Sequence, residues 1–273
     1  MLYTRRNEKV MTKIIHYCWF GSPVPDTVKR NVENWSRLNP DFEIREWNDS
    51  NCDVSEYEFG RRARSARRWG FVVDPVRVDK LYEFGGWYVD ADVEMITPLS
   101  RYEEDGDKLI IGYLYDCALG TAVVYSPPQH PYLAKIRMRY HRIHTDFWPV
   151  SNSIFTECFI NEVPGFLLNG ERWEDDKALV LPRDVFEQPS LIRTRGTSIH
   201  HCCGSWVPAA DNRFSVSSTA AGAAHLIKWA KRWRRNYLQL RSNEFAPCYR
   251  AAKKGIRLPF DASKYYLPGG LGE

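Results

Sequence analysis

The order of apolar and polar positions along the chain predicts strands that alternate with helices. Lys13–Trp19 is a short, largely apolar run that ends before a glycine and two prolines, which is typical of a buried strand. Asp26–Arg37 then repeats apolar residues at positions i, i+4 and i+7, the spacing of one helix face. Phe42–Trp47 alternates as expected of an edge strand. This strand–helix–strand opening predicts a parallel sheet covered by helices.

The middle of the chain continues the alternation. A helix is expected to begin at Asp74-Pro75, because Asp is a favourable N-cap and proline is favoured at the first helical position, and Gly85-Gly86 ends it. Further helices are expected at Glu56–Trp69 and Pro131–His144, and further strands at Trp87–Val89, Lys108–Tyr115, Leu119–Tyr125, Ala178–Leu181 and Ser198–His201. The prediction is an α/β fold with a mixed, mostly parallel sheet.

Composition is that of a globular protein, but the charge is divided unevenly. The 273 residues are 44% hydrophobic and 26% charged, which excludes a disordered chain or a fibre. Residues 1–218 carry 27 Lys/Arg against 31 Asp/Glu, whereas residues 219–273 carry 11 against 3. We therefore expect two parts, a main domain (1–218) and a basic helical C-terminal extension (219–273), which face different partners.

The extension contains one amphipathic helical stretch. Its apolar residues recur at helical spacing, at Leu226, Trp229, Ala230, Trp233, Tyr237 and Leu240. Basic residues lie among them, at Lys228, Lys231, Arg232, Arg234, Arg235 and Arg241. Two interpretations stay open: residues 225–241 contact an anionic membrane surface, or the helix docks on the main domain with its basic side in water. Nucleic acid is not expected as a partner, because no known nucleic-acid module accompanies the basic residues.

Cysteine usage indicates a reducing compartment. The seven cysteines are scattered and form no C-x-x-C pair, so zinc-ribbon and thioredoxin-like sites have no support. The chain has no apolar run of the roughly 18 residues that a membrane-spanning helix needs. Its first ten residues are polar and lack the apolar core of a secretory signal. We expect a cytoplasmic protein, with peripheral contact at the inner face of the cell membrane as an option for the basic helix.

The strongest chemical signal is Asp90-Ala91-Asp92, which directly follows the short strand Trp87–Val89. Ligands of open α/β sheets bind beyond the carboxyl ends of the strands. Two carboxylates one residue apart can approach one divalent cation there and leave positions open for phosphate oxygens. Taken alone, the D-x-D triplet is a weak signal, since it also occurs by chance in turns.

Three motifs in order resemble the glycosyltransferases whose sugar-binding region contains a DXD motif. The resemblance is carried by Ile14-Ile15-His16-Tyr17-Cys18-Trp19-Phe20-Gly21, by Asp74, Arg77, Leu81, Tyr82, Gly85, Gly86, Tyr88, Asp90 and Asp92 in register, and by Ile199-His200-His201-Cys202-Cys203-Gly204-Ser205-Trp206. This family includes capsular-polysaccharide sugar transferases and yeast initiating mannosyltransferases, with the clostridial glucosylating toxins as distant relatives. The sequence departs from the family pattern at Val73, where the family has Ser, at Pro75, and at Cys202, where the family has an aromatic residue.

The resemblance implies a GT-A (Rossmann-like) nucleotide-sugar-binding domain, Mn²⁺ or Mg²⁺, and transfer with retention of anomeric configuration. It implies donor binding by Trp19, Asp74, Arg77, Tyr88, Asp90, Ser205 and Trp206, catalytic roles for Asp74, Arg77, Asp90 and Asp92, and metal binding by Asp90, Asp92 and His201. By the residues alone, His200 and His201 point to opposite faces, so at most one enters the site. His16 is expected to be an inner histidine with its hydrogen bonds satisfied, and Asp74 has a helix-capping role as an alternative.

The expected function is metal-dependent transfer of a hexose from a nucleoside-diphosphate sugar, with UDP favoured over GDP, to a glycan or lipid-linked acceptor in surface-polysaccharide synthesis. One alternative is a phosphohydrolase of the haloacid-dehalogenase type, which also uses D-x-D and for which Asp175-Asp176 could imitate the second acidic pair. Another is a donor-binding or membrane-scaffold protein without turnover, which the changes at Val73 and Cys202 keep open.

Overall fold

The computed structural model describes residues 11–144, 146–192, 195–202 and 223–267. The strands are β1 (Ile14–Cys18), β2 (Glu43–Trp47), β3 (Gly86–Val89), β4 (Val93–Met95), β5 (Leu109–Tyr115), β6 (Ala118–Ser126), β7 (Trp173–Glu174), β8 (Ala178–Leu181) and β9 (Ser198–His200). The helices are α1 (Asp26–Leu38), α2 (Glu58–Ser65), α3 (Trp69–Phe84), the 3₁₀ helix η1 (Leu99–Asp105), α4 (Pro131–Tyr140), α5 (Ser151–Glu162), α6 (Arg183–Phe186), α7 (Ala223–Ser242) and α8 (Ala246–Ala252).

One seven-stranded sheet organises the chain, in the order β2-β1-β3-β6-β5-β8-β7. β2 and β3 both run parallel to β1, and β8 runs parallel to β5. β6 is antiparallel to β3 and to β5, and β7 is antiparallel to β8. Five of the seven strands therefore share one direction, which confirms the predicted mixed, mostly parallel sheet and the α/β class. β4 and β9 form a separate antiparallel pair.

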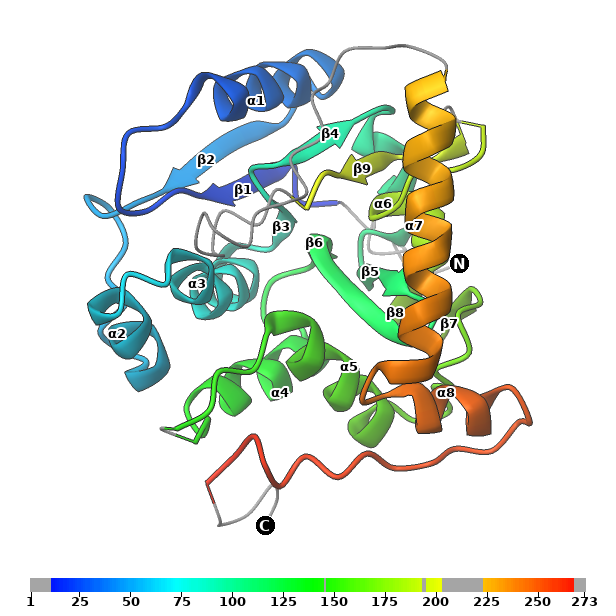
Figure 1. Cartoon of the computed structure of the whole chain (residues 1–273). Helices are drawn as coiled ribbons and strands as arrows, with labels where there is room; N and C mark the ends of the chain where they lie inside the picture. The colour runs from blue at the N-terminus through cyan, green and yellow to red at the C-terminus, as the bar shows by residue number, and fades with distance from the viewer. Residues whose placement is uncertain (1–10, 145, 193–194, 203–222, 268–273) are drawn as a thin grey trace, which may run out of the picture.

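Helices cover both faces of this sheet (Figure 1). Side chains alternate between the faces along each strand. In β5, for example, Leu109 and Ile111 belong to one buried cluster, together with residues of α3, α4 and α5. Ile110 belongs to the other cluster, which also contains Trp35 of α1. The opening predicted from the sequence, β1 followed by α1 and the edge strand β2, is confirmed.

The predicted start of α3 is wrong. The helix begins at Trp69, so Asp74 is an internal residue instead of the N-cap, and Pro75 lies inside the helix. Proline inside a helix costs about 3 kcal/mol, because it removes a backbone hydrogen bond. The buried side chains on either side of it, Val72 and Val76 among them, offset this cost by packing into the core. Tertiary packing thus extends the helix backwards past the position that the capping signal marks.

Gly85 and Gly86 end α3 as predicted, and their positive φ values of 66° and 100° explain the choice of residue. A Cβ atom on Gly86 would lie 2.7 Å from the carbonyl oxygen of Ile14 in β1. His16 ties this corner together, because its Nε2 donates to the Gly85 carbonyl at 2.8 Å and its Nδ1 accepts from the Trp47 indole at 3.1 Å. Burial lowers the pKa of His16 to about 4, so it is a neutral inner histidine, as expected.

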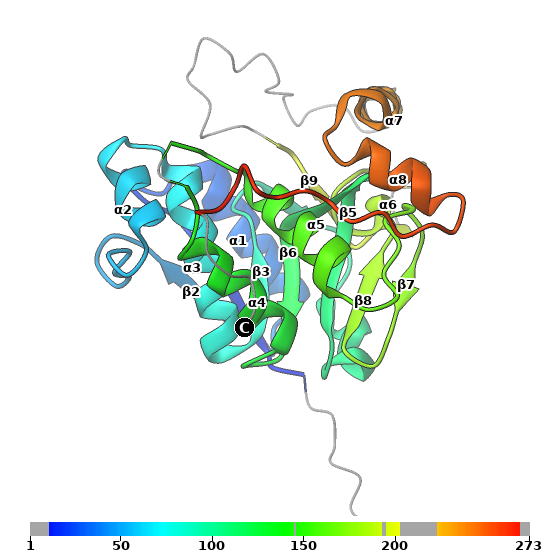
Figure 2. The same cartoon turned by 90° about the horizontal axis from the view of Figure 1, so that it is seen from below.

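The C-terminal segment packs against the rest of the chain. α7 lies along one side of the molecule, and Figure 2 shows it end-on at the periphery. Beyond it, Phe245, Cys248, Tyr265 and Tyr266 join the same buried cluster as α5. The predicted boundary between residues 218 and 219 falls within 203–222, outside the described residues. Among those described, no helix combines the length and apolar character that a bilayer crossing requires.

Candidate functional site

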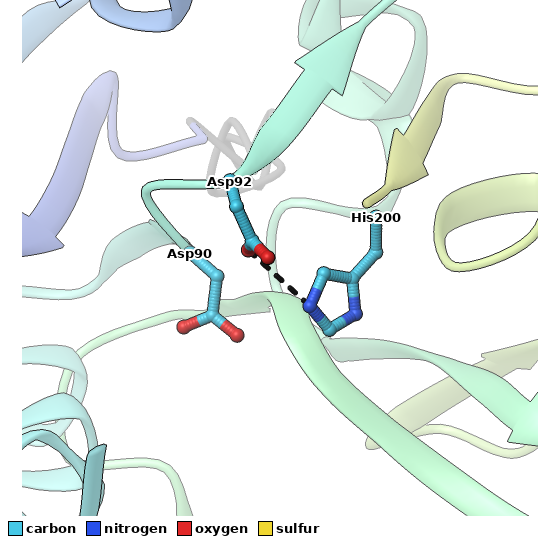
Figure 3. A group of neighbouring side chains, drawn as sticks. All are labelled: Asp90, Asp92 and His200. Carbon is cyan, nitrogen blue, oxygen red and sulfur yellow. Dashed lines mark ion pairs between the residues drawn. The ribbon is translucent and has the colours of Figure 1, made fainter. Parts of the chain in front are cut away.

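Asp90 and Asp92 lie in a tight turn at the carboxyl end of β3. The turn is held by the Asp90 backbone N–H, which donates to the Ala122 carbonyl at 2.7 Å, and by the Val93 N–H, which donates to the Asp90 carbonyl at 2.9 Å. It joins β3 to β4 and lets both carboxylates turn to the same side, as Figure 3 shows. The sequence motif therefore occupies the sheet edge where ligands of open α/β folds bind.

His200 completes the group from a distant part of the chain. β9 pairs with β4 in a register that sets His200 opposite Val93, the residue after Asp92. The His200 Nε2 atom lies 3.3 Å from Asp92 Oδ1. Asp90, Asp92 and His200 each offer one ligand atom, and these three atoms lie within 4.8 Å of one another. Two carboxylates and an imidazole suit a divalent ion such as Mn²⁺, and three protein ligands leave positions for substrate oxygens. The residues present fit the metal that the sequence predicts.

Glu187, which follows α6, orients the His200 ring. It is 1% exposed, and its Oε2 accepts from His200 Nδ1 at 2.8 Å while its Oε1 accepts from the Ala122 N–H at 3.0 Å. A Cβ atom on Gly120 would lie 2.1 Å from Glu187 Oε1, so a side chain at this position would displace the carboxylate. Metal-binding histidines commonly donate their second nitrogen to such a carboxylate. Glu187 was not predicted as a site residue, because no periodicity or motif marks it.

The charge of His200 is set by its neighbours. Burial opposes a charged imidazole, but Cys202, Asp92 and Glu187 outweigh this effect and raise the pKa of His200 well above its usual value. The protonated ring then forms ion pairs with Asp92 and Glu187. A metal ion would take the place of the Nε2 proton, so its binding would release that proton.

His201 lies elsewhere, which corrects the sequence prediction. Its Nε2 is 3.2 Å from Glu94 Oε2, and its Nδ1 is 2.9 Å from Lys228 Nζ. Neighbouring residues of an extended chain point to opposite sides, so only one of the two histidines can face Asp92. The pairing of β9 with β4 determines that this residue is His200. In the described residues, the acidic pair thus meets His200 instead of His201.

Asp74, Arg77 and Tyr88 come together beside Asp90, and their predicted roles in donor binding and catalysis stay predictions. Arg77 is 4% exposed, and its Nη2 lies 2.8 Å from Asp90 Oδ1 and 3.8 Å from Asp74 Oδ1. Its guanidinium carbon lies 4.4 Å from the centre of the Tyr88 ring, and the Tyr88 hydroxyl donates to Asp90 Oδ1 at 3.0 Å. One buried cation therefore stands between two carboxylates beside the D-x-D turn.

The two carboxylates respond to this crowding. Burial raises the pKa of Asp74 to about 7, with Asp90 raising it further and Arg77 opposing both. Burial likewise raises the pKa of Asp90, although Arg77 and His200 favour its charged form. Each of these carboxyls is therefore easier to protonate than a free one, and a bound cation would favour their charged forms.

Trp19 lies just beyond the end of β1, at the same edge of the sheet. Its backbone N–H donates to the Trp47 carbonyl at 2.9 Å, while its ring is half-buried against the cluster that contains Trp35. The indole Nε1 is buried and has no hydrogen-bond partner. Its role as a platform for the donor base stays a prediction. Ser205 and Trp206, also predicted to contact the donor, lie outside the described residues.

Asp175 and Asp176 do not approach the site. They precede β8, which runs in the same direction as β3. They therefore lie at the amino ends of these strands, whereas Asp90 lies at the carboxyl ends. Asp175 accepts from the backbone N–H groups of Lys177 and Ala178, at 2.8 and 2.6 Å, as part of a turn. The second acidic pair that a haloacid-dehalogenase-type enzyme needs is therefore not supplied by these residues.

The fold and the site thus define an α/β protein with a candidate divalent-metal group at the carboxyl edge of its sheet. Residues 25–114 match the family described as "Glycosyltransferase sugar-binding region containing DXD motif". The match includes Asp74, Arg77, Tyr88, Asp90 and Asp92. The resemblance inferred from the sequence is confirmed for this region.

A curated relative and two solved structures bear related names. The chain is 25% identical over 195 residues to "Inositol phosphoceramide mannosyltransferase 2" of Schizosaccharomyces pombe, covering 65% of this chain and 54% of the relative. It therefore spans about half the length of that relative. The structure is similar to "PaToxG Glycosyltransferase" (TM-score 0.47, 16% identity, 57% of this chain and 70% of the other). It is also similar to a "glycosyltransferase involved in the glycosylation of the major capsid of PBCV-1" (TM-score 0.43, 11% identity, 69% and 93%). At these TM-scores the structural likeness adds nothing to the family match.

Proposed function

We propose that the chain is a metal-dependent, retaining glycosyltransferase that moves a hexose from a nucleoside-diphosphate sugar to a glycan or lipid-linked acceptor. The observation that carries the proposal is the Asp90–Asp92–His200 group at the carboxyl edge of the sheet, with two of its members inside the matched region. The name of the Schizosaccharomyces relative specifies a mannosyl transfer to a lipid, which supports a lipid-linked acceptor. Surface-polysaccharide synthesis and a UDP-sugar donor remain parts of this proposal.

In this proposal each side chain has a distinct task. Asp90, Asp92 and His200 hold Mn²⁺ or Mg²⁺, which when bound supplies positive charge for the leaving diphosphate. Arg77 keeps Asp90 in position by its 2.8 Å contact and adds a second fixed cation at the same edge. Asp74 and Tyr88 line the donor side of the site. Trp19 contributes a flat apolar surface suited to stacking with a nucleoside base.

The direct test is a panel of UDP- and GDP-sugars, a mannose donor among them, with and without Mn²⁺. Donor hydrolysis and thermal stabilisation are measured for each, since a ligand of the folded state raises the melting temperature. We expect one donor to be both stabilising and hydrolysed, with retention visible in the anomeric proton signals of the product. Stabilisation without hydrolysis or transfer would favour the donor-binding alternative. Release of phosphate from simple phosphate esters would favour the phosphohydrolase.

We also propose that α7 contacts an anionic membrane surface, at the inner face of the cell membrane of a cytoplasmic protein. Five large apolar side chains of α7 are between 44% and 55% exposed: Leu226, Ile227, Trp233, Tyr237 and Leu238. The helix has no acidic residue, and most of its basic residues lie on the exposed side. Exposed aromatic groups beside cations suit the interface of an anionic bilayer.

Point substitutions test this contact better than deletion, because residues beyond α7 belong to the buried core. We expect the chain to sediment with vesicles that contain phosphatidylglycerol, and less with phosphatidylcholine alone. Trp233→Ser with Tyr237→Ser should weaken the binding. Ile256→Ser is the matched control, since Ile256 is 55% exposed but lies outside α7. Equal sedimentation of all three proteins would contradict the membrane contact.

A further inference from the structure

α7 docks on the molecule largely through polar side chains, although Leu240 near the end of the helix packs against the buried core. His225, Lys228, Arg232 and Asn236 follow one another at helical spacing on the docked face, whereas apolar residues such as Trp233 are exposed. Buried polar groups are costly unless each has a specific partner. A face of this kind therefore determines position more than it adds stability.

Every one of the four docked residues has such a partner. The partners are the Ser190 carbonyl for His225 (2.9 Å), His201 Nδ1 for Lys228 (2.9 Å), residues 200–202 for Arg232, and Asp116 for Asn236 (2.8 Å). The middle two contacts are to the segment that ends β9, next to the candidate metal group. The outer two contacts are to Ser190 and Asp116, which lie outside that segment.

Arg232 makes the most extensive of these contacts. It is 9% exposed, and its Nη2 donates to the carbonyl oxygens of His200 at 3.1 Å and His201 at 3.0 Å. Its Nη1 lies 3.0 Å from the Cys202 sulfur. The planar guanidinium thus spans three consecutive residues, for which the compact ammonium group of lysine has no equivalent geometry.

We infer that Arg232 is a positioning residue for His200, an inference that rests on the proposed metal-dependent function. Glu187 holds the His200 ring through Nδ1, and Arg232 holds its main chain through the carbonyl oxygen. Together they keep Nε2 directed toward Asp92. The C-terminal helix is therefore a structural part of the metal site, although it lies outside the residues that match the glycosyltransferase family.

The test is Mn²⁺ binding, followed by electron paramagnetic resonance on the full chain with and without UDP. Arg232→Ala should weaken Mn²⁺ binding by about 10- to 100-fold, the loss typical of outer-shell partners of a metal ligand. Arg232→Lys keeps the charge but not the planar guanidinium, and should show an intermediate loss of Mn²⁺ affinity. The matched control is Arg234→Ala, which removes the same charge from the exposed side of the same helix and should bind like the wild type.

A double-mutant cycle separates positioning from a general loss of structure. In a His200→Ala background, Arg232→Ala should cause no further loss of Mn²⁺ affinity, because its effect passes through His200. A further loss of equal size would overturn the inference, as would unchanged binding by Arg232→Ala in the wild-type background. If Arg232→Ala does not fold, the same double-mutant cycle is measured with Arg232→Lys. A wild-type chain that binds no Mn²⁺ would overturn the metal-dependent function, and this inference with it.

Discussion

Two arginines on two helices flank the candidate site, and they differ in what surrounds them. Arg77 lies on α3, a helix largely buried in the core, and bonds to a carboxylate of the D-x-D motif. Arg232 lies on the peripheral helix α7 and bonds to main-chain carbonyls at the end of β9. The first neutralises charge within one contiguous stretch of chain. The second joins two distant segments. The site therefore has a local half, made of Arg77 with the D-x-D motif, and an assembled half, made of His200 with Glu187 and Arg232.

The largest effect is expected at Asp92, where the two halves meet. Asp92→Ala removes a proposed ligand oxygen and the 3.3 Å partner of His200. Mn²⁺-dependent donor hydrolysis should fall by about a thousandfold or more, since a metal contributes several kcal/mol to transition-state stabilisation. Initial rates with the best donor of the panel measure this. Asp176→Ala, an exposed change at the opposite edge of the sheet, is the control. Normal turnover by the Asp92 variant would contradict the proposed function.

The local half should depend strongly on Arg77 for stability. Arg77→Ala leaves Asp74 and Asp90 close together without the cation between them, and breaking a buried ion pair from one side costs about 3–5 kcal/mol. The free energy of unfolding in urea at pH 7 measures the loss. Arg234→Ala, on the surface of α7, should change it by less than about 0.5 kcal/mol. Similar losses of unfolding free energy in both variants would contradict a structural role for Arg77 in the buried ion pairs.

The assembled half should depend on Glu187. In Glu187→Gln the amide nitrogen can face His200 Nδ1, so two donors would meet where a donor and an acceptor now do. We expect Mn²⁺ affinity to fall by about 10- to 100-fold. Mn²⁺ binding followed by electron paramagnetic resonance, as for the Arg232 variants, measures this affinity. An unchanged affinity would show that the His200 ring needs no support from Glu187.

The smallest effect expected is a gain in stability at Asp74. Its pKa is raised to about 7 from an ordinary 3.8, so its charged form destabilises the folded chain as the pH rises through this window. Asp74→Asn removes the charge and should stabilise the chain by about 1–2 kcal/mol at pH 8 but not at pH 3.5. Urea unfolding at both pH values measures the difference. A gain of the same size at pH 3.5 would mean that titration is not its cause.

Much of the local half could be predicted from the sequence because its signals are contiguous. The glycines after α3, the short strand β3 and the D-x-D turn follow one another within a few residues, and each acts through local backbone geometry. The capping signal at Asp74-Pro75 failed for a tertiary reason, since core packing extends α3 to Trp69. α5 was not predicted, because a helix buried on nearly all sides shows no amphipathic period.

Residue patterns over short spans are enough to predict the fold class, the succession of the main strands along the chain and the acidic pair. Which histidine meets that pair depends on the register of β9 on β4, which no short pattern encodes. The same is true of Glu187 and Arg232, which hold His200 from two sides. His200 lies far along the chain from both Asp92 and Arg232, and contacts over such separations leave no period in a single sequence.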